Sequence, residues 1–159
     1  MRSLVLVVLL SVFSFADHLP ANLIARGKPE TLLCGIDVNH TTLSDVKKRF
    51  STPLSYKTYP ETEEAAEIVW DQEGSRIHAT INADNIAYAV DVSGKPSPIA
   101  KTGRGLALGQ SSADIKRIYG PRFRQRGNNI TLQWQDGTEL RVRLTSGRIS
   151  SLELIASVE

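Results

Sequence analysis

Residues 130–144 read ITLQWQDGTELRVRL, and this stretch predicts a β-hairpin. The Asp-Gly pair at 136–137 is among the strongest two-residue turn signals for a hairpin. Every second residue on either side of that pair is apolar: Ile130, Leu132 and Trp134 before it, and Leu140, Val142 and Leu144 after it. Such alternation is typical of antiparallel strands with one buried face and one face in water.

The residues that flank this hairpin predict a third strand and a short helix. Ile149, Leu152 and Leu154 mark the strand, after a turn at 145–147. Upstream, Ser111 and Asp114 are spaced as a helix N-cap and its capping-box partner. Gly120-Pro121 then ends the helix. A helix of two to three turns is marginal alone, so we expect it to pack on the sheet.

A second block of the chain matches this arrangement. Residues 40–51 align with residues 109–120 at a constant offset of 69, and three further stretches alternate like strands, at 68–70, 77–81 and 86–92. The positions that correspond in the two blocks are Thr42 with Ser111, Asp45 with Asp114, Phe50 with Tyr119, and Trp70 with Trp134. The match predicts a duplicated unit.

We therefore expect an α+β fold of two tandem repeats that share a core or place their sheets side by side. Each repeat is a short helix followed by a three-stranded antiparallel meander, with the helices on one face of the sheet. The predicted boundaries are a loose N-terminal arm at 17–31, a first repeat at 32–92, a linker at 93–104 and a second repeat at 105–159.

The pattern Gly109-Gln110-Ser111-x-x-Asp114-Ile115-x-x-x-Tyr119-Gly120-Pro121 resembles the start of domains of the SmpA/OmlA (BamE-like) family. The tandem layout is similar to that of the β-lactamase inhibitor protein. The resemblance covers residues 35–92 and 105–159. It implies helices on one sheet face and a binding role rather than a catalytic one.

Composition sets broad limits on the protein class. The chain has 159 residues, 19 lysines and arginines against 17 aspartates and glutamates, and one cysteine. This length supports one modest domain or two small ones and, with a single cysteine, excludes a disulfide scaffold. The small net charge of +2 gives no argument for nucleic-acid binding.

The first sixteen residues predict a signal peptide. Arg2 precedes an apolar run from Leu4 to Phe15, and small residues stand where a peptidase would cut after Ala16. A membrane anchor needs roughly 20 apolar residues. We therefore expect a secreted or periplasmic protein. Its one cysteine, Cys34, cannot form an intramolecular disulfide, so it is either buried or pairs between chains.

Charge is distributed unevenly along the chain. Residues 17–100 carry 8 basic and 12 acidic side chains, whereas residues 101–159 carry 10 and 5. We expect a partner-binding surface on the polar sheet face and the loop after the second helix, formed by Gln133, Gln135, Arg141, Arg143, Arg122, Arg124 and Arg126. Its partner would be an acidic protein, with an anionic lipid or polymer as alternatives.

No catalytic or metal-ligating pattern stands out in the sequence. The three histidines, His18, His40 and His78, lack the spacing of metal ligands, and no nucleophile or phosphate-binding motif occurs. We expect no metal or cofactor and predict a non-enzymatic binding module. One alternative is an inhibitor of an extracellular hydrolase that inserts the loop Tyr56 to Glu67. Another is an unfamiliar enzyme that uses His78.

Overall fold

The computed structural model describes residues 23–50, 52–59 and 64–157. The signal peptide predicted at 1–16 lies outside these residues. In chain order, the elements are β1 (Leu32–Leu33), β2 (Ile36–Asp37), α1 (Leu43–Arg49), β3 (Ser55–Thr58), β4 (Glu64–Gln72), β5 (Ser75–Asn82), β6 (Ala87–Gly94), α2 (Ser112–Tyr119), β7 (Arg124–Arg126), β8 (Asn129–Gln133), β9 (Glu139–Thr145) and β10 (Arg148–Ile155). None of the helices in this part of the chain has the length and apolar character that a membrane crossing requires.

The predicted fold class is wrong. The described chain is mostly β, with one eight-stranded antiparallel sheet, a two-stranded sheet and two short helices, rather than two helix-plus-meander repeats. The strand order in the large sheet is β3-β4-β5-β6-β10-β9-β8-β7. The strands of both predicted meanders form one sheet, and β3 and β7, which lie in predicted loops, add a strand at each edge.

The pairing of β6 with β10 joins the sheet at its middle. Leu152 lies opposite Val92 and Leu154 opposite Val90, and the pairing continues to Ile155 opposite Ala89. β6 and β10 are far apart in the sequence, so no turn between neighbouring strands brings them together. The result is one continuous apolar face, whose buried apolar residues on the strands are Ala66, Ile68, Trp70, Ile77, Ala79, Ile81, Ala87, Val90, Val92, Ile130, Leu132, Leu140, Val142, Leu144, Ile149, Leu152 and Leu154.

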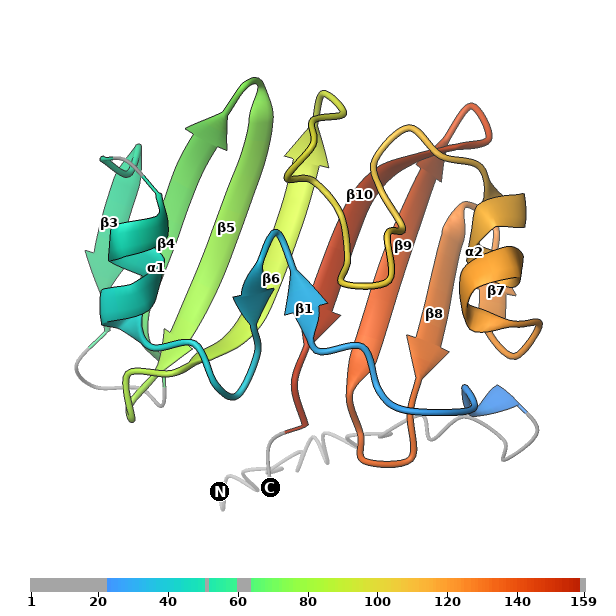
Figure 1. Cartoon of the computed structure of the whole chain (residues 1–159), viewed down its shortest axis with the longest axis horizontal. Helices are drawn as coiled ribbons and strands as arrows, with labels where there is room; N and C mark the ends of the chain where they lie inside the picture. Colours follow the sequence, from blue (N-terminus) through green and yellow to red (C-terminus); the bar gives the residue numbers. More distant parts are fainter. Residues whose placement is uncertain (1–22, 51, 60–63, 158–159) are drawn as a thin grey trace, which may run out of the picture.

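Four segments cover this apolar face (Figure 1). α1 lies over the β3–β4 side and α2 over the β7–β8 side, while the β1–β2 hairpin and the loop from 95 to 111 lie over the middle. The loop is held by backbone hydrogen bonds, among them Gly109 N–H to Ile149 O at 2.8 Å. The cover supplies further buried residues to the single core, including Ile36, Leu106 and Ile115.

Both helices begin with the caps that their sequences predict. The Thr42 hydroxyl accepts a hydrogen bond from Asp45 N–H at 3.2 Å before α1. At α2, Ser111 and Asp114 form a capping box, and the Ser111 N–H donates to Asp114 Oδ2 at 3.0 Å. These bonds satisfy backbone donors that the first helical turn leaves without partners.

Each helix also presents an aromatic ring to a tryptophan in the core. The ring centroids of Phe50, at the end of α1, and Trp70 are 5.0 Å apart. Those of Tyr119, on α2, and Trp134 are 5.9 Å apart, in an edge-on arrangement. All four side chains are buried. Such ring pairs add to the area that they bury, so they anchor two helices that are too short to be stable alone.

The β1–β2 turn contains the single cysteine. Cys34 is fully buried, with a φ of 54°, and its N–H donates to Lys101 O at 3.0 Å. Burial raises the pKa of its thiol from 9.0 to about 12. The neutral thiol therefore serves as a small apolar core residue.

The N-terminal segment is tied to the core by a buried carboxylate. Residues 17–31 were expected to be a loose arm, but in the described part Ala25 N–H donates to Gln133 O at 2.8 Å, and Glu30 is only 4% exposed. The Tyr119 hydroxyl donates to Glu30 Oε2 at 2.6 Å and lies 2.8 Å from the Thr102 hydroxyl. The backbone N–H groups of Leu32 and Arg104 donate to the same carboxylate.

This contact predicts that Tyr119→Phe destabilises the fold. Removing the hydroxyl deprives the buried Glu30 carboxylate of a donor, at a cost of about 1–3 kcal/mol in the free energy of unfolding. Urea denaturation at neutral pH measures that cost. Tyr56→Phe is the matched control because Tyr56 is exposed, and it should change stability by no more than about 0.5 kcal/mol. Equal stabilities for the two variants would contradict the role assigned to the hydroxyl.

Candidate binding face

The second face of the large sheet is polar, and we call it the polar face. Strand alternation places on it every residue that lies between the buried ones. The register aligns one row across seven strands, and the strand order from β4 to β7 gives Val69, His78, Asp91, Glu153, Arg141, Thr131 and Arg124. Glu67, Arg76, Glu139 and Arg143 flank this row.

In the described part of the chain, three charge contacts lie on the polar face, one on the β5–β6 side of the β6–β10 seam and two on the β9–β10 side. His78 Nδ1 lies 2.7 Å from Asp91 Oδ2. Arg141 Nε donates to Glu139 Oε1 at 2.6 Å, and its Nη1 donates to Glu153 Oε2 at 3.2 Å. Asp91 and Glu153 are register partners across the seam, so two like charges lie side by side. The cation beside each carboxylate reduces that repulsion.

His78 has a raised pKa in this setting. The hydrogen bond to Asp91 raises the pKa above its ordinary value of 6.5, partial burial opposes the shift, and the negative charges of Asp91, Glu67 and Glu153 add to the rise. The imidazole side chain is 30% exposed, so solvent reaches the pair. His78 therefore remains charged to higher pH than an isolated histidine.

Four arginines converge on the β7–β9 side of the polar face, and we call them the basic patch: Arg124, Arg126, Arg141 and Arg143. Thr131 of β8 is the register partner of both Arg124 on β7 and Arg141 on β9. Asn129 is likewise the register partner of both Arg126 and Arg143. Within the described ranges, no ion pair involves the side chain of Arg126 or Arg143. Their charges therefore face solvent, whereas Arg141 is held by two carboxylates.

A shallow hollow of about 240 Å³ lies within the basic patch. Its polar lining comes from β8, β9 and β10, namely Asn129, Thr131, Arg141, Arg143, Ser151 and Glu153. Guanidinium, amide and hydroxyl groups meet here on neighbouring strands. The Glu153 carboxylate in this lining is already bonded to Arg141, which leaves the Arg143 guanidinium and the amide and hydroxyl donors available to an anionic group.

The structure brings together some of the residues that the sequence predicted for this surface. Arg124, Arg126, Arg141 and Arg143 share the polar face, and Gln133 lies half-buried on it at the end of β8. Gln135 instead lies exposed in the turn after Trp134, and Arg122 lies half-buried in the loop after α2, so neither belongs to a strand.

Several residues of the face were not predicted, because they depend on strand pairing. Glu153 and Ser151 border the hollow only because β10 pairs with β9, and Asp91 joins the row only across the seam. Their alternation with buried residues marked them as polar. Nothing local in the sequence indicated which strands would be neighbours.

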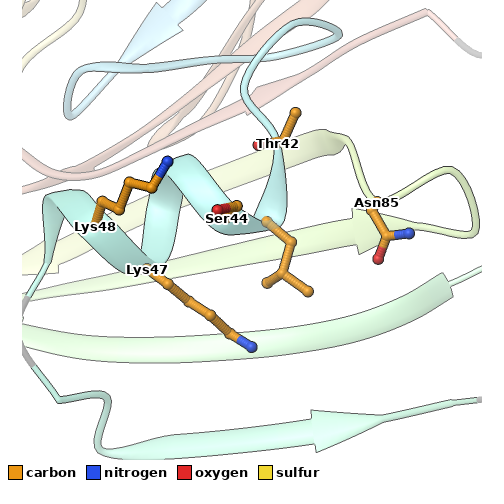
Figure 2. Close-up of a pocket in the computed structure, with 6 residues that line it drawn as sticks. Thr42, Ser44, Lys47, Lys48 and Asn85 are labelled. Atoms are coloured by element: carbon orange, nitrogen blue, oxygen red, sulfur yellow. The ribbon is translucent and has the colours of Figure 1, made fainter.

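A larger hollow of about 510 Å³ lies beside α1 (Figure 2). Its lining residues are Thr42, Leu43, Ser44, Lys47, Lys48 and Asn85. Figure 2 shows the side chains of Lys47 and Lys48 pointing in different directions, and Lys48 Nζ lies 3.8 Å from Asp45 Oδ1. The two ammonium groups do not converge on one point, so this hollow is a weaker candidate than the basic patch.

Metal binding finds no support in this part of the chain. Among the described residues, no three His, Cys, Asp or Glu side chains are grouped so that they could hold a metal ion. His78, Asp91 and Glu153 share a row, but they do not form such a group.

Comparison with known proteins bears on the fold alone. No family model and no curated protein matches the chain. A solved structure, that of a DUF4309 family protein (YjgB) from Bacillus subtilis, matches with a TM-score of 0.51 at 17% sequence identity, over 77% of this chain and 83% of that one. The resemblance to tandem BamE-like units and to the β-lactamase inhibitor protein is therefore wrong, because the matching structure is a DUF4309 protein and the chain is mostly β.

The His78–Asp91 pair predicts a measurable titration. In an NMR titration, His78 should have a pKa above 6.5, and Asp91→Asn should lower it, because the charged hydrogen-bond acceptor is lost. A raised folded-state pKa means that the pair stabilises the fold below the unfolded pKa, and that this stability is lost as pH rises through the folded pKa. The free energy of unfolding of the wild type minus that of Asp91→Asn should therefore be largest below the unfolded-state pKa of His78, and it should fall as pH rises through the folded-state pKa.

His40 provides the internal control for the same experiment. It is exposed and lies beside Asp37, so Asp91→Asn should leave its resonance unchanged. An identical His78 titration in wild type and variant would show that Asp91 does not stabilise the imidazolium.

Proposed function

We propose that this chain is an exported, non-enzymatic protein-binding module that docks on an acidic protein surface through the basic patch of its polar face. The supporting observation is that four arginines lie on β7 and β9, the two strands that flank β8, and that two of them have no ion pair among the described residues. A cluster of charges of one sign creates a surface potential that attracts and orients a partner of opposite charge.

Arginine chemistry favours a carboxylate-bearing partner. The planar guanidinium offers two parallel N–H groups that match the two oxygens of Asp or Glu. Asn129 and Ser151, which line the hollow beside Arg143, can add further donors to a bound carboxylate. A protein with clustered acidic side chains would satisfy several of these groups at once.

The two arginines of β9 have different roles in this proposal. Arg141 is engaged by Glu139 and Glu153, so it shapes the hollow and its charge is partly compensated. Arg143 points from the same face without an ion pair among the described residues, so it is the anchor for the incoming carboxylate. Charge attraction across the whole patch would accelerate the encounter and weaken with salt.

Other functions remain as alternatives with less support. An inhibitor role was assigned to a loop from Tyr56 to Glu67. Much of that stretch instead forms the paired strands β3 and β4, with Tyr56 opposite Ile68. An enzymatic role would use His78 beside Asp91, and a loss of turnover in His78→Ala would favour it. An anionic lipid or polymer is the other ligand class that a basic patch could take.

The export part of the proposal depends on residues outside the described ranges. The apolar run from Leu4 to Phe15 and the small residues before Asp17 support cleavage after Ala16. Mass spectrometry of the exported protein tests this, and a mature chain that does not begin at Asp17 would contradict the proposed site.

The direct test measures binding of the protein to poly-L-glutamate by biolayer interferometry. Arg143→Glu should weaken binding by about tenfold or more, because a repulsive charge replaces the anchor. Arg141→Ala should have a smaller effect, since Arg141 is already paired. Raising the salt concentration should weaken wild-type binding.

Lys116→Glu is the matched control, because it makes the same change of charge at an exposed residue of α2, which lies on the apolar side of the sheet and away from the basic patch. Equal losses in Lys116→Glu and Arg143→Glu would mean that net charge alone explains binding. Tighter binding to anionic phospholipid vesicles than to poly-L-glutamate would instead assign the patch to a membrane surface. Both outcomes would overturn the proposal.

A further inference from the structure

β7 is the edge strand of the sheet on the side of the basic patch. Figure 1 shows it beyond β8 and behind α2, and β8 is its paired neighbour. The strand has three residues, of which Gln125 and Arg126 are exposed. The opposite edge, β3, carries Lys57, whose ammonium group already lies 4.1 Å above the Tyr59 ring.

The outer side of β7 offers backbone hydrogen-bonding groups at Gln125. Leu144 N–H donates to Asn128 O at 2.8 Å. Because hydrogen-bonded residues alternate along an antiparallel strand, the even-numbered residues of β8 are those whose backbone groups bond to β9. The odd residues Asn129 and Thr131 then bond to their register partners Arg126 and Arg124. Alternation along β7 therefore directs the N–H and C=O of Gln125 away from the sheet.

The side chains of β7 add charge to this edge. Arg124 and Arg126 share the polar face because their register partners Thr131 and Asn129 do. A strand placed beside β7 would bring two of its own residues, spaced two apart, opposite these arginines at a Cβ separation of roughly 5 Å. Carboxylates at those two positions would meet both guanidinium groups.

From this geometry we propose that β7 accepts an extended acidic segment of the partner as a ninth strand, bonded to the backbone of Gln125 and carrying Asp or Glu at alternating positions. The inference rests on the proposed function and specifies how the partner binds. Strand addition supplies main-chain hydrogen bonds, and side chains at alternate positions supply selectivity. The basic patch then recognises both the charge and the extended shape.

The first experiment compares three synthetic peptides by fluorescence anisotropy with the wild-type protein. One is a heptapeptide that alternates threonine and glutamate, the second has the same composition with its three glutamates three residues apart, and the third is the alternating peptide with N-methylated backbone amides. The alternating peptide should bind about fivefold or more tightly than either of the others, because only it combines matched spacing with free N–H groups.

The second experiment alters the edge itself. Gln125→Pro removes the outward N–H, and proline is tolerated on an edge strand where that group faces solvent. It should reduce binding of the alternating peptide by about tenfold, whereas Gln125→Ala, which keeps the N–H, should bind like wild type. Circular dichroism confirms that both variants are folded. If Gln125→Pro does not fold, the N-methylated peptide still decides the question.

The outcomes separate this inference from the proposed function. If all three peptides bind equally, and weaken equally in Arg143→Glu, strand addition is wrong while the basic patch stands. If no peptide binds and poly-L-glutamate also fails to bind, the proposed function is wrong and the inference falls with it. Preference for the alternating peptide, lost on N-methylation, supports strand addition.

Discussion

The pairing of β6 with β10 is the constraint on which the rest of the structure depends. It joins strands that lie about sixty residues apart in the chain, and Leu152 and Leu154 meet Val92 and Val90 there. With this pairing, eight strands form one sheet, and six of them, β4, β5, β6, β8, β9 and β10, share one apolar face and one core. Without it, the half of the sheet from β3 to β6 and the half from β7 to β10 would each expose an unpaired strand edge and the apolar side chains along it to water. A one-sided sheet of this width needs an extensive cover, and the two short helices cannot provide it alone.

The need to cover the apolar face explains why the helices and loops outside the sheet pack on that face. The β1–β2 hairpin and the loop from 95 to 111 lie over the seam, between α1 and α2 (Figure 1). Glu30 is buried beneath this cover because Tyr119 and two backbone N–H groups satisfy its carboxylate. With these segments on the apolar face, the polar face carries the side chains of the strands themselves. Its chemistry is therefore set by strand register, which aligns Arg141 and Arg143 of β9 with Arg124 and Arg126 of β7 across β8.

Local features of the structure could be predicted from the sequence, whereas its assembly could not. Alternation identified β8 and β9 and the outward position of Arg143, and the capping box at Ser111 located the start of α2. The fold class was wrong because alternation marks β6 and β10 as strands but does not indicate that these two strands pair with each other. The same limit applies to the candidate site. Arg124 was predicted as a loop residue, and the contact between Arg141 and Glu153 depends on which strands are neighbours.

Native-state hydrogen exchange tests the central claim, that the sheet is one cooperative unit joined at the β6–β10 seam. The amides to measure are those of Val90, Val92, Leu152 and Leu154, compared with amides within β5 and β9. The account predicts that seam amides exchange with the same opening free energy as the others, and that this value equals the global free energy of unfolding. Seam amides that exchange through a much smaller opening, while β5 and β9 stay protected, would show two separable halves and contradict it.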